Sequence, residues 1–216
     1  MHRFTGHDLT CIRGERTVFT GLGFAVMSGG ALVLTGPNGS GKSSLLRLMV
    51  GLLRPAAGAI AWNDERTDDD PDAHRARLLY VSHQDAVKPA LTVGENLSFW
   101  AALTTTSAPS STNAVDDALQ AFGIAHLADV PARYLSAGQK RRLTLARLVA
   151  TPAVLWLLDE PTTALDADAV VRLRRAIERH RAGGGLVVVS THADLDLADA
   201  RSLDLSAAEA PAEARP

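Results

Sequence analysis

The chain has 216 residues, of which 46% are hydrophobic and 21% are charged, and its formal net charge at pH 7 is -2. This length suits a single globular domain, and the near-neutral charge offers no general attraction to nucleic acid. The only cysteine, Cys11, excludes an internal disulfide and a cysteine-rich metal site. We therefore expect a buried thiol in a protein of a reducing compartment.

The sequence contains no segment that would carry it across a membrane. Its first ten residues lack the continuous apolar stretch of a secretory signal. The most apolar segments are short and end in glycine, proline or a charge, whereas a membrane-spanning helix needs about 20 apolar residues. We expect any membrane role to depend on partner proteins.

The chain begins with a pattern typical of an antiparallel sheet. Val18, Leu22, Phe24 and Val26 alternate with small or polar residues, which predicts a half-exposed sheet beside the core. Farther on, short apolar runs predict buried strands at residues 31–35, 78–82, 153–158 and 186–191. Helical patterns occupy residues 44–53, 139–150 and 168–181. This alternation of strands and helices predicts the α/β class with a parallel sheet.

The remaining segments have less regular patterns. Residues 92–150 are mainly helical in pattern, interrupted at 104–113 by Thr, Ser, Ala and Pro that predict an exposed loop. Residues 207–216 alternate Ala with Glu and Pro, which is typical of a frayed, disordered tail. We expect the three tryptophans, Trp62, Trp100 and Trp156, to pack in cores.

A phosphate-binding loop is the first motif that carries chemistry. Residues 36–43 match the P-loop pattern between a predicted strand and a predicted helix. The glycines let the backbone N–H groups and the helix N-terminus face phosphate oxygens. We expect Lys42 to reach the β- and γ-phosphates of ATP and the Ser43 hydroxyl to ligate Mg²⁺. The nucleotide-binding residues of this loop are Gly36, Pro37, Asn38, Gly39, Ser40, Gly41, Lys42 and Ser43. The alternative is a glycine-rich turn with a solvated lysine.

An acidic pair follows the predicted strand at residues 153–158. Asp159 and Glu160 would emerge at the carboxyl end of that strand, where parallel sheets bind ligands. We expect Asp159 to hold Mg²⁺ through water, and Glu160 to orient and deprotonate the water that attacks the γ-phosphate. The alternative is an acidic turn before Pro161.

A third motif separates this chain from kinases and GTPases, which also carry the first two. Leu135-Ser136-Ala137-Gly138-Gln139 resembles the LSGGQ signature of ATP-binding cassette (ABC) ATPases, with Ala137 in place of one glycine. The resemblance covers nearly the whole chain and implies one ABC ATPase domain at residues 1–206. It also implies a P-loop NTPase fold with a RecA-like core sheet, an antiparallel β subdomain and a helical subdomain at about 88–150.

Three further residues resemble motifs of the same family. Gln84 resembles the Q-loop glutamine, Asp166 the D-loop aspartate and His192 the switch histidine. The resemblance implies that Gln84 contacts Mg²⁺ and the attacking water, and that His192 contacts the γ-phosphate. Taken singly, Gln84 could be a surface loop residue, Asp166 a helix cap and His192 a histidine at a strand end.

The signature also implies that the chain works in pairs. Ser136, Gly138 and Gln139 would complete the ATP site of a second copy, so that two ATP molecules lie between two chains. The family usually stacks adenine on an aromatic residue, and Arg13 stands at the corresponding position here. We expect the guanidinium of Arg13 to cover adenine, and the alternative is an exposed turn charge.

A closer resemblance indicates which kind of ABC ATPase this chain is similar to. Residues 80–88, 91–97 and 129–134 are similar to the ATP-binding subunit of the cytochrome c maturation haem exporter. This implies a peripheral ATPase on the cytoplasmic side of the inner membrane, bound to integral membrane subunits and meeting haem only through them. The alternatives are an ATPase subunit of another ABC exporter, a soluble ABC ATPase for iron-sulfur cluster assembly, or a non-catalytic nucleotide-binding scaffold.

His83 and the basic residues of two predicted helices remain to be interpreted. We interpret His83 as part of the groove that receives a membrane subunit, the alternative being a solvated loop histidine. Two helices are rich in arginine, and we expect solvated faces rather than contacts with lipid head groups. These residues are Lys140, Arg141, Arg142 and Arg147 in one helix and Arg172, Arg174, Arg175 and Arg179 in the other.

Overall fold

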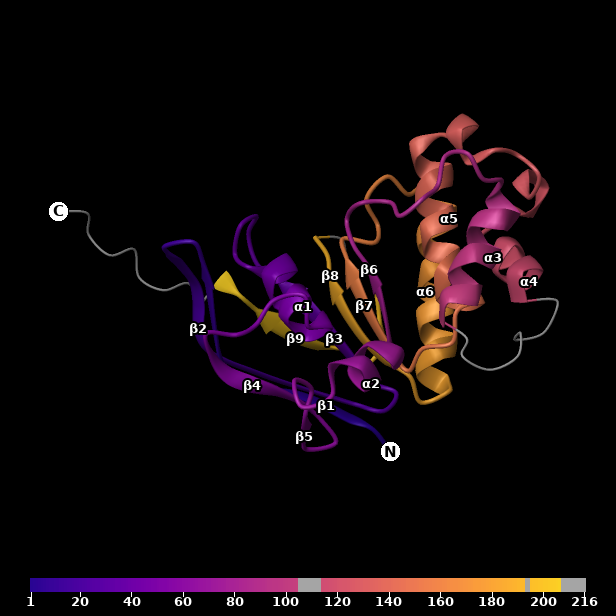
Figure 1. Cartoon of the computed structure of the whole chain (residues 1–216). Coiled ribbons are helices and arrows are strands. Elements are labelled where there is room, and N and C mark those ends of the chain that lie inside the picture. Colours follow the sequence, from indigo (N-terminus) through magenta and orange to yellow (C-terminus); the bar gives the residue numbers. More distant parts are fainter. Residues whose placement is uncertain (105–113, 193–194, 207–216) are drawn as a thin grey trace.

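The fold consists of two sheets with a helix between them and further helices outside. The computed structural model describes residues 1–104, 114–192 and 195–206. One sheet has four strands in the order β2-β1-β4-β5, and the other has five in the order β6-β7-β8-β3-β9. Figure 1 shows α1 between the two sheets and α3 to α6 on the far side of the five-stranded sheet.

The four-stranded sheet is antiparallel and comes mostly from the start of the chain. Its strands are β1 (Arg3–Arg13), β2 (Arg16–Met27), β4 (Ala57–Trp62) and β5 (Glu65–Arg66). Leu22, Phe24 and Val26 of β2 are buried and alternate with exposed residues, as the sequence pattern predicts. Cys11 is buried in the same core, which confirms the expected buried thiol.

The five-stranded sheet is parallel and contains all four predicted buried strands. These are β3 (Ala31–Thr35), β6 (Leu78–Val81), β7 (Leu155–Asp159) and β8 (Leu186–Ser190). The fifth strand, β9 (Arg201–Asp204), was not predicted, because it pairs only with β3 at the sheet edge and leaves three of its four residues exposed. Such a strand lacks the apolar run that marks a central one.

The helices are α1 (Lys42–Val50), α2 (Pro71–Ala76), α3 (Val93–Thr104), α4 (Ala114–Ala121), α5 (Ala137–Ala150) and α6 (Ala167–Ala182), with 3-10 turns η1 (Ala125–Leu127) and η2 (Ala132–Tyr134). Side chains cap the starts of α2, α5 and α6, whereas α1 follows the glycines of the P-loop without a side-chain cap. Asp166 accepts a hydrogen bond from the N–H of Ala169 and thereby starts α6 one residue before the predicted position. The predicted loop and tail fall, apart from Thr104 at the end of α3, outside the described residues.

Two apolar cores lie on the two faces of the parallel sheet. One joins this sheet to α1 and the antiparallel sheet and contains Trp62, and the other joins it to α3 to α6 and contains Trp156. Trp100 differs from expectation, because it is only half-buried and donates its indole N–H to the carbonyl of Ala86 at 3.0 Å. In the described ranges, no helix is long and apolar enough to cross a membrane.

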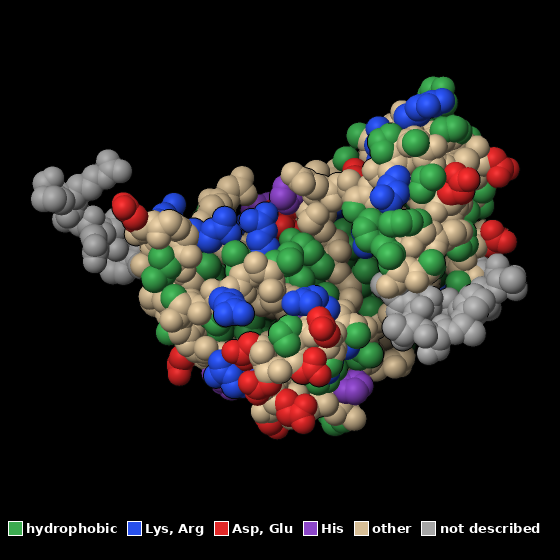
Figure 2. Space-filling view, in the orientation of Figure 1, with side chains coloured by type: hydrophobic (Ala, Val, Ile, Leu, Met, Phe, Trp, Pro, Cys, Tyr) green, Lys and Arg blue, Asp and Glu red, His purple; other side chains and the backbone are tan. Residues whose placement is uncertain are grey.

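Charges of both signs are mixed on the surface, in keeping with the small net charge. Figure 2 shows acidic side chains gathered over β5 and the start of α2. The exposed acids there are Asp64, Glu65, Asp68, Asp69, Asp70 and Asp72. Basic side chains lie among the acids over the rest of the face shown in Figure 2, so this face does not carry the uniformly basic surface that attracts nucleic acid.

The buried imidazole of His74 should make folding sensitive to acid. Its Nε2 donates to the carbonyl of Met49 at 2.7 Å, while its Nδ1 is buried without a hydrogen-bond partner. Burial lowers the pKa of His74 below its ordinary 6.5, outweighing the contact with Met49. As pH falls below that value, the unfolded chain takes up a proton that the native chain refuses, so the free energy of unfolding decreases.

We predict that the urea midpoint of unfolding falls between pH 7.5 and pH 5.5, and that His74→Gln reduces this fall. His7→Gln, at an exposed position of β1, serves as the control. An equal pH dependence in the parent and in His74→Gln would contradict the assignment.

Candidate active site

The P-loop occupies the turn between β3 and α1 and depends on its glycines. Gly36, Gly39 and Gly41 have φ angles of 128°, 86° and 103°. A Cβ atom on Gly41 would lie 2.6 Å from Cγ1 of Val18, so no other residue fits there. Lys42 Nζ donates to the carbonyls of Gly36 at 2.8 Å and Pro37 at 3.0 Å. The ammonium group therefore lies over the loop in which phosphate would sit.

Asp159 is the centre of the site. It ends β7, is completely buried, and accepts hydrogen bonds at Oδ1 from Ser43 Oγ at 3.0 Å and Ser190 Oγ at 2.7 Å. Its Oδ2 is buried and has no hydrogen-bond partner. A buried carboxylate oxygen without a partner is costly, and a cation would remove that cost. The hydroxyl of Ser43 and the carboxylate are the oxygen ligands that Mg²⁺ prefers, so these residues fit the expected metal.

Glu160 and His192 form a pair beside this carboxylate. His192 Nε2 lies 3.1 Å from Glu160 Oε1. Glu160 has a φ of 49°, in the left-handed region, and its N–H is held by the carbonyl and the hydroxyl of Ser190, each at 3.0 Å. A strained backbone that the surroundings hold in place is typical of functional residues. Ser190 was not among the predicted site residues, although its position two residues before His192 placed it at the end of β8.

The structure puts His83 rather than Gln84 next to the acidic pair. His83 Nδ1 lies 3.8 Å from Asp159 Oδ2, whereas we expected His83 in a groove for a membrane subunit. Gln84 follows it in an exposed turn, in which Ser82 Oγ donates to the Gln84 carbonyl at 2.9 Å. Among the described residues, no hydrogen bond joins the Gln84 side chain to Asp159 or Glu160. Its assignment to Mg²⁺ therefore remains a prediction.

Arg141 was placed on a solvated face, and that prediction is wrong. The side chain is 2% exposed, and its guanidinium donates to the carbonyls of Asp159 at 3.2 Å and Glu160 at 2.7 Å. It also reaches the Ser82 carbonyl at 2.9 Å and the Asp85 carboxylate at 3.4 Å. Burial lowers the pKa of Arg141, and Asp85 opposes that shift. The hydrogen bonds of Arg141 thus link the acidic pair to the turn that carries Gln84.

Arg147, on the same helix, was also expected on a solvated face, and that prediction is wrong too. It is 8% exposed, its guanidinium carbon lies 3.8 Å from the centroid of the Trp100 ring, and burial lowers its pKa to about 10. Helical spacing could have signalled Arg141, since it precedes the buried Leu145 by four residues and Leu148 by seven on one face of α5.

The signature residues form a separate site at the start of α5. Ser136 Oγ accepts from the N–H of Gln139 at 3.2 Å, and Gln139 Oε1 accepts from the N–H of Ser136 at 2.9 Å. A pocket of about 320 Å³ there is lined by Ser136, Gly138, Gln139 and the D-loop residues Ala164 and Asp166, among others. Its lining residues come from 123–142, 164 and 166, so the structure does not bring the signature to the P-loop of the same chain.

Asp166 has two roles in this second site. Besides capping α6, its carboxylate accepts from Arg142 Nη2 at 2.6 and 2.7 Å. The N–H of Ala169 and the guanidinium of Arg142 lower the pKa of Asp166. Arg13, the expected adenine contact, is exposed at the end of β1, where it pairs with Arg16 in the hairpin register.

Comparison with known proteins identifies the family. The ABC transporter family matches residues 19–163. The chain belongs to this family. Two of its most similar relatives are the proteins named "Cytochrome c biogenesis ATP-binding export protein CcmA" of Paramagnetospirillum magneticum and Rhodospirillum rubrum. Each is 57% identical over 202 residues, which cover 94% of this chain and 93% and 85% of the relatives, respectively.

A solved structure agrees with this membership. An ATP-binding cassette in a dimeric, post-hydrolysis state bound to ADP and Pi matches with a TM-score of 0.79 and 26% identity over 90% of each chain. The family and the fold identify the chain as an ATP-binding and ATP-hydrolysing subunit of an ABC transporter. The predicted α/β P-loop fold is thereby confirmed, and the kinase and GTPase alternatives are excluded.

Replacing Arg141 should lower the stability of the protein, because the backbone of Asp159 and Glu160 loses its hydrogen-bond donors. Arg141→Ala removes donors from several buried carbonyls, and we predict a loss of about 3 kcal/mol of stability in urea unfolding. Arg133→Ala, at an exposed position of η2, is the control and should change stability by less than about 0.5 kcal/mol. Similar losses for the two variants would show that the Arg141 contacts contribute little.

Proposed function

We propose that this chain is the ATPase of an exporter that delivers haem for the maturation of c-type cytochromes. The names of the two relatives at 57% identity carry this proposal, because they combine ATP binding, export and cytochrome c biogenesis in one protein. The intact set of hydrolytic residues supports the ATPase part of the proposal over a non-catalytic scaffold.

In the proposed mechanism, the P-loop holds ATP and Glu160 prepares water for attack. The backbone N–H groups of residues 36–43 and the ammonium of Lys42 bind the phosphates. Ser43, Asp159 and Gln84 would hold Mg²⁺, which supplies positive charge against the negative charge that develops on the phosphate oxygens. Glu160 takes the proton of the attacking water, and its contact with His192 keeps its carboxylate oriented.

His192 also has a direct role in this proposal. Its ring lies exposed beside Glu160, from where it can donate a hydrogen bond to the γ-phosphate. Arg13, exposed at the hairpin end, would cover the adenine with its guanidinium plane.

Two copies of the chain would form the working unit. Ser136, Gly138 and Gln139 at the start of α5 form an anion site of their own, and in the proposed dimer this site contacts the ATP bound to the partner's P-loop. Integral membrane subunits would bind the pair on the cytoplasmic side of the inner membrane. Haem would be handled by those subunits, so that the chain contributes the cycle of closure and opening.

Replacing Glu160 should separate hydrolysis from binding. Glu160→Gln keeps the size of the side chain but removes the base, so we predict that turnover falls by about 10²–10⁴-fold while ATP affinity stays the same. Phosphate release and equilibrium binding of ATP measure the two quantities. Glu178→Gln on the exposed face of α6 is the matched control, and unchanged turnover in Glu160→Gln would rule out the assigned base.

Mixing two inactive variants tests the composite site. Lys42→Ala disables the P-loop and Ser136→Arg disables the signature, so each variant alone should be inactive. In a mixed dimer, one site carries both defects and the other carries none. We therefore predict that mixing restores ATPase activity to roughly a quarter of the parent, since about half of randomly paired dimers are mixed. Absence of any recovery would favour a site built within one chain.

Deleting the gene tests the haem assignment. We predict that covalent haem on c-type cytochromes disappears from stained gels of the deletion strain and returns with the parent gene, but not with the Glu160→Gln gene. Normal haem staining in the deletion strain would favour another exporter. Purification of the tagged protein without any integral membrane protein would favour the soluble ATPase alternative.

A further inference from the structure

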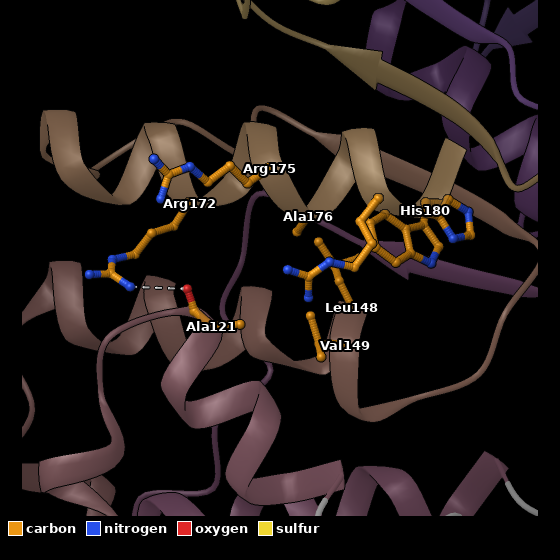
Figure 3. A pocket seen from close by; sticks show the side chains of 9 residues that line it. Ala121, Leu148, Val149, Arg172, Arg175, Ala176 and His180 are labelled. Atoms are coloured by element: carbon orange, nitrogen blue, oxygen red, sulfur yellow. Dashed lines mark hydrogen bonds between the residues drawn. The ribbon is translucent and has the colours of Figure 1, made fainter. Parts of the chain in front are cut away.

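A second cavity lies away from the nucleotide site, between α6 and the helices packed beside it. It has a volume of about 360 Å³, within the range of small-molecule sites. Its lining residues come from the end of α4, the end of α5, β7 and α6. Figure 3 shows Arg172 and Arg175 on α6 above Leu148 and Val149 of α5, with Ala121 between the helices. No residue of the P-loop or of the acidic pair lines this cavity.

Three arginines on one face of α6 line the cavity. Arg172, Arg175 and Arg179 are spaced three and four residues apart, so that their side chains follow one another along the helix. Arg172 donates to Asp168 at 2.7 Å and to the carbonyl of Ala121 at 3.4 Å, the contact drawn in Figure 3. Within the described ranges, neither Arg175 nor Arg179 has a hydrogen bond or an ion pair from its side chain.

Arg174, which lies next to Arg175 in the chain, does have charged partners. Arg174 points to a different face of α6, where it pairs with Glu178 at 3.8 Å and with Asp196 at 3.1 Å. Carboxylates are therefore available on α6 and near it, but not at Arg175 and Arg179. Both side chains are exposed and line the same cavity, and a guanidinium group can bind a phosphate or carboxylate in the bidentate manner.

The floor of the cavity combines apolar side chains with two nitrogen-containing rings, those of Trp156 and His180. Trp156 of β7 is 4% exposed and stacks on His180, with the ring centroids 3.8 Å apart and the planes 5° from parallel. Its indole Nε1 is buried and has no hydrogen-bond acceptor. Burial lowers the pKa of His180, so the stacked imidazole is neutral near pH 7. The two stacked rings offer an apolar surface to a ligand in the cavity.

We propose that this cavity binds an organic anion that joins a phosphate or carboxylate to an apolar body. Arg175 and Arg179 would bind the anionic group, while Trp156, Leu148 and Val149 would contact the apolar part. Such a ligand would contact α5, α6 and β7 together and reinforce the link that Arg172 makes to the end of α4. The proposal stands independently of the haem assignment. A soluble metabolite and the head group of an acidic lipid share this chemistry.

Titration with 1-naphthyl phosphate tests the site. The protein is labelled with ¹⁵N at its indole groups and kept saturated with MgADP to occupy the P-loop, and Trp156→Phe assigns the Trp156 signal. We expect this signal to shift saturably while that of Trp62 stays in place. Arg175→Gln/Arg179→Gln should weaken binding by about tenfold or more, and neutral 1-naphthol should bind correspondingly less well.

A matched charge control separates a site from general attraction. Arg54→Gln/Arg201→Gln removes two exposed arginines outside the cavity and should leave the affinity unchanged. No saturable shift of the Trp156 signal, or equal weakening in both double variants, would overturn the proposal.

Vesicles then distinguish the two sources of the anion. If the natural ligand is a lipid, the parent sediments with phosphatidylglycerol vesicles but not with phosphatidylcholine vesicles, and Arg175→Gln/Arg179→Gln abolishes sedimentation. If the ligand is soluble, the Trp156 signal responds to 1-naphthyl phosphate but the protein sediments with neither vesicle. Either result supports the cavity as an anion site. A failed titration with 1-naphthyl phosphate contradicts the proposal, whatever the vesicles show.

Discussion

The structure depends on how one fully buried carboxylate, Asp159, is stabilised. Burying a carboxylate is expensive unless donors or cations surround it, and here Ser43 and Ser190 donate to one of its oxygens. These hydroxyls come from the first turn of α1 and the end of β8, so the carboxylate joins the ends of three chain segments. Within the described residues, the other oxygen accepts no hydrogen bond, and His83 Nδ1 lies 3.8 Å from it. This oxygen is therefore free to serve as a ligand of a cation such as Mg²⁺.

Arg141 extends this arrangement from the core sheet to the helical side of the molecule. Its guanidinium contacts the backbone of Asp159 and Glu160 and the turn at Ser82 at the same time. A planar group with five donors can hold several carbonyls in a defined geometry, which a lysine could not do. Arg141 lies on α5, which begins at the signature. It therefore connects Asp159 and Glu160 to the helix that, in the proposed dimer, contacts a partner chain.

The two ends of α6 have different surroundings. At its first turn, Asp166 caps the helix and binds Arg142, close to the signature. Toward its other end, Arg175 and Arg179 line a cavity with an apolar floor. Burial of the Trp156 ring against His180 makes that floor rigid, because stacked rings at van der Waals distance have little room to move. The same helix thus carries a paired acid near one site and unpaired cations near another.

The amino-acid sequence by itself determined the four buried strands of the parallel sheet, the P-loop, the acidic pair and the signature. Each depends on a local pattern: an uninterrupted apolar run for β3 and β8, glycines for the loop, and a serine followed by a glutamine three residues later for the cap of α5. Only the tertiary structure decided which carbonyls Arg141 contacts, that His83 faces Asp159, and that Ser190 holds Asp159 and the N–H of Glu160. These contacts join residues 18 to 76 positions apart, and the energy of burying a charged or polar group depends on neighbours that no local pattern specifies.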